Sequence, residues 1–230
     1  MVIFMNFDQV IKKLKSKSRP GELAGMARFG IVGEGRLGVS VPELRKLAKE
    51  IGKDHGLALK LWKTGIPDAM LLAGMVDEPE KVTEKQMDAW VKDFQSWDVC
   101  DQACCNLFDR VPFTVKKINQ WAKSEKEFIK RAAFAMIAAM AWHDTEAPDK
   151  DFIRFFPLMK KAATDERNFV RKAVNWALRN IGKKNPKLNR EAIKLAKEIQ
   201  KLDSKAARWI AADAIRELES EAVQARLRKS

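Results

Sequence analysis

Apolar and polar residues follow one another along this chain with the period of an amphipathic helix. From Phe4 to Lys15, apolar side chains recur three or four positions apart, so that they share one helical face. The same period returns from Pro42 onward, and no segment shows the convincing two-residue alternation of a strand. The pattern predicts an all-α protein of about a dozen helices.

Proline, glycine and capping side chains mark where these helices begin and end. Pro42 stands in a first helical turn, while Gly65 and Pro67 separate two helices. Thr83 and Ser96 have the side chains preferred at an N-cap. The later predicted helices span 84–94, 97–109, 114–122, 125–142, 149–163, 168–182, 186–200 and 203–219.

Six of the eleven glycines lie between Gly21 and Gly38, which predicts an irregular connection over about 19–41. The segment 33–38 has the form GxGxxG. A dinucleotide-binding fingerprint needs a strand before it and a helix that opens within the glycines. The next helix begins only after Ser40 and Pro42, so turns are expected here and no cofactor is predicted.

The helices repeat along the chain. Residues 128–136 align with 169–177, which lie 41 positions later, and 172–178 align with 205–211, which lie 33 positions later. Periods of this size predict an α-solenoid of HEAT-like or armadillo-like repeats, curved with a concave groove. A basic residue recurs beside the small Ala-rich stretch of each copy, at Arg131, Lys172 and Lys205, so the groove is expected to be basic.

We expect one repeat domain over 1–230, with a flexible tail over about 221–230 that includes the basic residues from Arg226 to Lys229. The longest apolar run, 132–142, is too short to span a bilayer, and 1–10 lacks the basic start of a secretory signal. A monomeric cytoplasmic protein is predicted. Its three cysteines have no nearby histidine, so reduced thiols and no metal site are expected.

Charge is unevenly distributed in a chain of formal net charge +13. Residues 171–190 carry seven basic and no acidic side chains, whereas 66–109 carry ten acidic and three basic ones. A basic face suits nucleic-acid phosphates, because neutralising them releases counterions. Solvated helix faces, and less well a membrane surface, are the alternatives. If the groove binds DNA, the acidic segment should lie mainly on the convex side.

One stretch combines an aromatic ring with a carboxylate. Ser96-Trp97-Asp98-Val99-Cys100-Asp101 places Trp97 and Asp101 four positions apart, so both project from one face of a helix. Asp98 lies one position away from Trp97 and does not share that face. The pair suggests a carboxylate that acts on a cationic or cation-forming substrate.

Three segments together resemble the DNA alkylation repair glycosylases built from HEAT-like repeats, the AlkD type. They are Ser-Trp-Asp-x-x-Asp at 96–101, Phe-Ile-Lys-Arg-Ala-Ala at 128–133 and Lys-Ala-Val-Asn-Trp-Ala-Leu-Arg at 172–179. The turn at 38–42 is also similar, and the resemblance covers roughly 24–218. It implies a monofunctional glycosylase that removes N3- or N7-alkylated purines from double-stranded DNA in base excision repair.

The resemblance carries over Asp101 as the catalytic carboxylate and Trp97, Trp176 and Arg131 as substrate-binding residues. Further DNA contacts are expected from the basic side chains Arg179, Lys172, Arg171 and Lys130. Without the resemblance, the residues alone favour a packing role in the core for both tryptophans, as we expect for Trp62, Trp90, Trp121 and Trp142. The alternative to substrate binding by Arg131 is an ion pair with Glu127, one helical turn earlier. A non-catalytic nucleic-acid-binding or protein-interaction module is the competing function.

Overall fold

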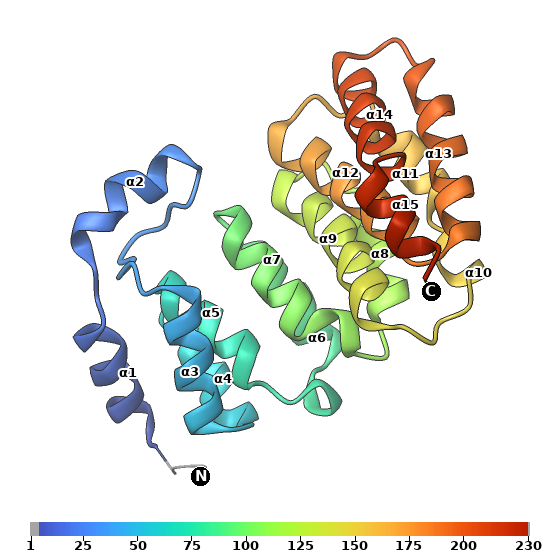
Figure 1. Ribbon diagram of the computed structural model, residues 1–230. Helices are drawn as coiled ribbons and strands as arrows, with labels where there is room; N and C mark the ends of the chain where they lie inside the picture. The colour runs from blue at the N-terminus through green and yellow to red at the C-terminus, as the bar shows by residue number, and fades with distance from the viewer. Residues whose placement is uncertain (1–4, 230) are drawn as a thin grey trace. The chain divides into compact units, whose positions relative to one another are not determined.

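The structure is a computed structural model that describes residues 5–229. The chain divides into two compact units, with the boundary between Phe113 and Thr114. Every regular element of the described residues is helical (Figure 1). The all-α prediction is therefore confirmed, although Phe4, where the first helix was expected to begin, lies outside the described residues. No helix in the described part is both long and apolar enough to cross a membrane.

The first unit is organised around α5, which spans Pro67–Val76. This helix is apolar around almost its whole circumference and only Met75 is not fully buried, as expected for a central helix. It packs against three neighbours, α3, α4 and α7, and against the N-terminal α1. The unit contains α1 Phe7–Ser16, α2 Leu23–Arg28, α3 Val41–Ile51, α4 His55–Lys63, α6 Glu84–Trp90 and α7 Trp97–Asn106.

An aromatic cluster joins α4 to α6. The rings of Trp62 and Trp90 stack with centroids 3.8 Å apart, and Phe94 packs edge-on against Trp62 at 6.0 Å. Trp62 and Trp90 are 5% and 4% exposed, and Trp121 in the second unit is 3% exposed. These three tryptophans therefore form core, as predicted from the sequence.

The second unit has two layers of helices (Figure 1). One layer consists of α9, α12 and α14, in which α12 packs against both others. In the other layer, α8 packs on α9, α11 packs on α12, and α13 packs on α12 and α14. The unit contains α8 Thr114–Trp121, α9 Glu127–His143, α10 Lys150–Ile153, α11 Phe156–Ala162, α12 Asn168–Gly182, α13 Pro186–Gln200, α14 Lys205–Leu218 and α15 Glu221–Leu227.

The repeat spacing is confirmed for the first pair of copies and is wrong for the second. Helices α9, α12 and α14 begin at Glu127, Asn168 and Lys205, which are 41 and 37 positions apart. The predicted second spacing of 33 differs from 37 by four residues, about one helical turn. A shift of one turn keeps the same face inward, so the hydrophobic pattern cannot distinguish the two alignments.

Two further expectations are wrong. The C-terminal segment from Glu221 is the helix α15, capped by Ser220 and anchored through the buried Val223 and Leu227. Trp142, expected in the core, is 65% exposed. Both errors arise because the residues that cover an element come from other helices, which a local pattern does not reveal.

Two carboxylates of the acidic middle segment lie inside the first unit. Asp68 and Asp77 are both 0% exposed. Asp68 accepts hydrogen bonds from the backbone N–H groups of Leu37 and Val39, each at 2.7 Å. Asp77 accepts one from the Gln86 amide at 2.6 Å. The expectation that the acidic side chains lie mainly on an outer, convex side is wrong for these two, which satisfy polar groups inside the unit.

Candidate functional site

Trp97 and Asp101 lie one turn apart in α7, as the sequence spacing predicted. Trp97 begins the helix and is partly exposed, whereas Asp101 is 9% exposed. The indole N–H of Trp97 donates to the backbone carbonyl of Phe29 at 2.8 Å. This bond orients the ring.

Asp98, the other carboxylate in the first turn of α7, is held in an internal ion pair. Arg36 donates to both of its oxygens, at 2.8 and 3.1 Å, and the Ser96 hydroxyl donates to it at 2.5 Å. The side chains of Arg36 and Asp98 are only 4% and 12% exposed. Asp98 therefore has a structural role.

The glycine-rich connection supports the start of α7. Phe29 contacts Trp97, and Arg36 also donates to the Val32 carbonyl at 2.9 Å and to the Ser96 hydroxyl at 3.2 Å. Gly38 has φ +77°, and a Cβ there would lie 2.8 Å from the Arg19 carbonyl oxygen. The described connection has no strand before its GxGxxG segment and no helix that begins within it, so it lacks the structure of a dinucleotide-binding loop and instead supports the start of α7.

The support from Phe29 and Arg36 was not recognised in the sequence. Arg36 lies 62 positions before Asp98, and Phe29 lies 68 positions before Trp97. A concentration of glycines before a helix signals a close connection, but it does not identify which helix the connection approaches.

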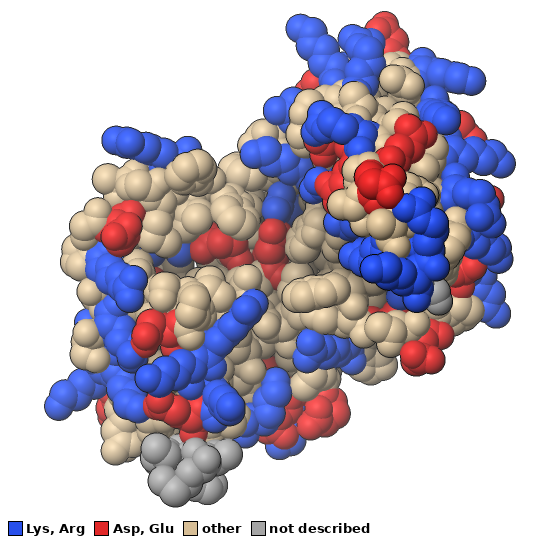
Figure 2. All heavy atoms as spheres, in the orientation of Figure 1, with Lys and Arg blue, Asp and Glu red and all other residues tan. Residues whose placement is uncertain are grey.

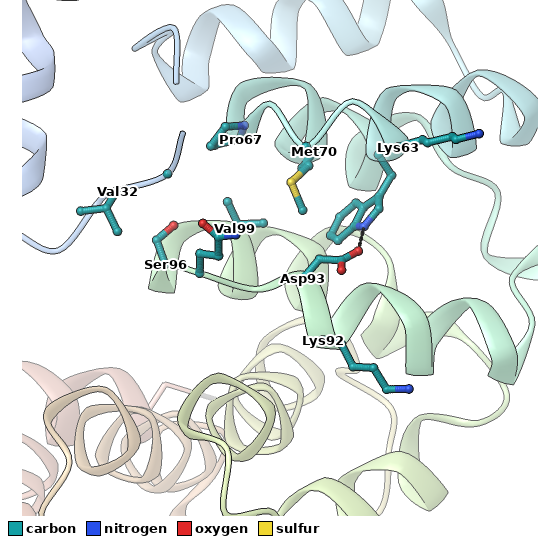
Figure 3. Close-up of a pocket in the computed structure, with 12 residues that line it drawn as sticks. Val32, Lys63, Pro67, Met70, Lys92, Asp93, Ser96 and Val99 are labelled. Atoms are coloured by element: carbon teal, nitrogen blue, oxygen red, sulfur yellow. Dashed lines mark hydrogen bonds between the residues drawn. The ribbon is translucent and has the colours of Figure 1, made fainter. Parts of the chain in front are cut away.

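A cavity of about 420 Å³ lies beside α7 in the first unit (Figure 3). Met70 points into it, and Ser96 and Val99 line its α7 side. Val99 is two positions from both Trp97 and Asp101, which places it on the opposite side of the helix. This cavity is therefore separate from the face that carries the candidate carboxylate.

In the second unit, Arg131 connects α9 to the start of α12. Its guanidinium donates to the Phe169 carbonyl at 2.6 Å, while the Glu127 carboxylate accepts from the Phe169 N–H at 3.2 Å. The rings of Phe128 and Phe169 pack 5.4 Å apart beside these contacts. Arg131 is only 5% exposed, so it serves the packing of two repeats whatever else it binds.

Two of the four predicted DNA-contacting cations have carboxylate partners. Lys130 pairs with Asp165 at 3.0 Å, and Arg179 pairs with Glu217 and, at 3.4 Å, with Asp213. Arg167 and Lys130 together lower the pKa of the Asp165 carboxyl to about 2.

The other two predicted cations have different surroundings. Arg171 lies over the ring of Trp209, 5.1 Å from its centroid, and Lys172 is exposed. Figure 2 shows Lys and Arg side chains over much of the second unit, with Asp and Glu side chains among them. The basic surface is thus an excess of cations within a mixed surface.

Trp176 lies on α12 and is partly exposed. It lines a second cavity, of about 710 Å³, together with Asn180 of the same helix and Lys183 at the C-cap of that helix. The structure thus places Trp97 and Asp101 on one helix of the first unit, and Arg131 and Trp176 on neighbouring helices of one layer in the second.

The cysteines lie together on α7. All three, Cys100, Cys104 and Cys105, are reduced. Burial raises the pKa of the Cys104 thiol well above its ordinary value. Between residues 5 and 229 there is no group of three His, Cys, Asp or Glu side chains that could hold a metal ion.

A model of the family described as DNA alkylation repair enzyme matches residues 10–218. Uncharacterized proteins from Listeria innocua and Listeria monocytogenes are 21% and 20% identical over 202 residues, covering 86% of this chain and 88% of theirs.

One solved structure has a similar fold. It represents a family of proteins related to the HEAT-like repeat DNA glycosylases, with affinity for branched DNA structures. The similarity has a TM-score of 0.78 at 20% identity and covers 97% of this chain and 96% of that one. The predicted HEAT-like repeat fold is therefore confirmed.

Proposed function

Since the chain belongs to the DNA alkylation repair enzyme family, we propose that it is a monofunctional DNA glycosylase that excises N3- or N7-alkylated purines from duplex DNA. The observation that carries this proposal is the pairing on α7 of a nearly buried carboxylate, Asp101, with the oriented indole of Trp97 one turn earlier.

The leaving purine needs little help from a general acid. Alkylation at N3 or N7 makes the purine cationic, so the N-glycosidic bond breaks with its electron pair passing to the purine. Positive charge develops on the sugar as an oxocarbenium ion, and water attacks C1′. Asp101 stabilises that charge and accepts the proton of the attacking water. Carboxylates perform both tasks in glycoside hydrolysis.

Aromatic and basic side chains have the supporting roles. Trp97 and Trp176 present π faces to the cationic base or sugar, each contributing about 0.5–2 kcal/mol. Arg131 binds a phosphate near the lesion and orients the duplex without reading sequence.

The remaining cations bind the DNA backbone. Lys172 and Arg171 bind phosphates directly, whereas Lys130 and Arg179 exchange carboxylate partners for phosphates when DNA binds. If these four and Arg131 each bind a phosphate, the logarithm of the association constant falls with the logarithm of salt concentration at a slope of about −4.5.

The test is release of free base from duplex DNA that contains N7-methylguanine. Asp101→Asn keeps the size of the side chain and removes its charge, so we expect excision to slow by at least about 100-fold. Asp98→Asn is the matched control in the same turn, assayed where it is folded, and it should keep most of the rate. If the wild-type protein releases no base, or if Asp101→Asn releases it at the wild-type rate, the proposed mechanism is wrong.

A second candidate function is recognition of DNA structure without catalysis. Its support is the similar fold of the protein family with affinity for branched DNA. Binding of a four-way junction at least tenfold tighter than a duplex of equal length, with no base release, would favour this function. Equal affinity for both DNAs together with base release would favour the glycosylase.

A further inference from the structure

The cavity that Trp176 lines has features not used in the proposed reaction. It lies where α9 and α12 end and α13 begins, and its volume of about 710 Å³ is within the range of small-molecule sites. Its cationic lining residues are Lys183, Lys184 and Arg226, and no described lining residue is Asp or Glu. The cavity therefore suits an anionic ligand.

An exposed indole stands in the wall of this cavity. Trp142 is 65% exposed, whereas the core residue Trp62 is 5% exposed. The Trp142 ring packs on His143, with centroids 4.8 Å apart and planes 27° apart, so its orientation is restrained. A restrained aromatic ring with so much exposed surface is a platform on which another planar ring can stack.

Backbone carbonyl groups position Arg226 and Lys184, and the carboxylates of Asp144, Glu146 and Asp149 lie near Lys184 without forming a salt bridge to it. Arg226 donates to the Lys183 carbonyl at 2.7 Å, and Lys184 donates to the Asp144 carbonyl while its ammonium lies 4.6 Å from the centroid of Phe152. Lys183 pairs with Glu217 at 2.7 Å. Arg226 and Lys184 are thus the better candidates to bind an anion.

We propose that this cavity binds an unpaired nucleotide of DNA, with its base stacked on Trp142 and its phosphate held by Arg226 and Lys184. Basic side chains combined with aromatic platforms are the general means by which proteins bind single strands. Bases inside a duplex are stacked on one another and cannot reach the indole. The proposal extends beyond excision and needs neither Asp101 nor an alkylated base.

A nucleobase with a phosphate can come from a DNA strand or from a free mononucleotide. Membership of a DNA repair family favours the strand. An acidic peptide would meet the cations but would gain little from the indole face, and a phosphate ion would gain nothing from it. Stacking on Trp142 is therefore the property that the experiment must isolate.

The experiment measures binding of a single-stranded oligonucleotide, a blunt duplex of the same sequence and dAMP to the wild type, Trp142→Ala and Trp142→Phe. The control is Trp209→Ala, because Trp209 is another exposed indole of the second unit and does not line the cavity; loss of its contact with Arg171 should weaken binding of both DNAs alike and leave their ratio unchanged. Circular dichroism of each variant verifies that it is folded. The readout is the ratio of single-strand to duplex affinity.

We expect Trp142→Ala to lower that ratio by about 5- to 140-fold, the range that corresponds to loss of one base–aromatic stack. The ratio for Trp142→Phe should lie between the ratios for Trp142→Ala and the wild type. Trp209→Ala should leave the ratio within about twofold of the wild type. Absence of single-strand binding by the wild type would overturn the proposal. An equal loss in both alanine variants, or dAMP binding as tight as that of the strand, would do the same. Base release is not part of this readout, so failure of the glycosylase proposal leaves the result interpretable.

Discussion

The ion pair between Arg36 and Asp98 is expected to stabilise the first unit and the start of α7. Arg36 makes hydrogen bonds to both Asp98 oxygens, the Ser96 hydroxyl and the Val32 carbonyl. Removal of its guanidinium leaves a carboxylate with 12% side-chain exposure without this cation. Breaking one partner of a buried pair costs about 3–5 kcal/mol.

A double-mutant cycle separates the pair from its surroundings. Arg36→Met keeps the aliphatic volume, Asp98→Asn keeps the shape of the carboxylate, and the double variant removes both charges. We expect each single change to cost several kcal/mol, and the double variant to cost less than their sum by about 1–3 kcal/mol. The free energy of unfolding is measured by urea denaturation of each variant and of the wild type.

The cycle also tests the link from the glycine-rich connection to Trp97. Because the same connection carries Phe29, whose carbonyl binds the Trp97 indole, Arg36→Met should broaden or shift the tryptophan emission before global unfolding. Additive single effects, within about 0.5 kcal/mol, would refute the coupling between the two side chains. An unchanged unfolding free energy in Arg36→Met would refute the structural role of the pair.

Two other changes probe separate parts of the fold. Asp165→Asn removes a carboxyl whose pKa is lowered to about 2 by Arg167 and Lys130. The stabilisation from this carboxylate is present above its unfolded pKa of about 3.9 and is lost as pH falls through about 2. The variant should therefore lose about 1–2 kcal/mol of unfolding free energy at pH 7, after allowance for solvent screening. Urea denaturation at several pH values should show the difference shrinking between about pH 4 and pH 2, and a constant difference would contradict the assignment. Gly38→Ala should cost about 1–3 kcal/mol through its positive φ and the approach to Arg19, whereas Gly21→Ala, with no atom within 4 Å of its added Cβ, should be nearly neutral. Equal urea midpoints for the two alanine variants would contradict this explanation.

The helical character of the chain and the proximity of Trp97 to Asp101 were determined by the sequence alone. Both depend on local geometry, since residues four positions apart share a face of any α-helix. The same reasoning selects Asp101 rather than Asp98 as the candidate carboxylate, which stays a prediction. It also identified the spacing between the copies at α9 and α12, where two long segments match residue by residue.

Tertiary structure decided the features that depend on contacts between distant residues. The burial of Asp68, the pairing of Asp98 with Arg36 and the exposure of Trp142 each depend on what a separate element places beside the side chain. The second repeat spacing differed from its prediction by one helical turn, which leaves the hydrophobic pattern unchanged. A local period specifies which face of a helix is buried, but only packing determines what that face meets.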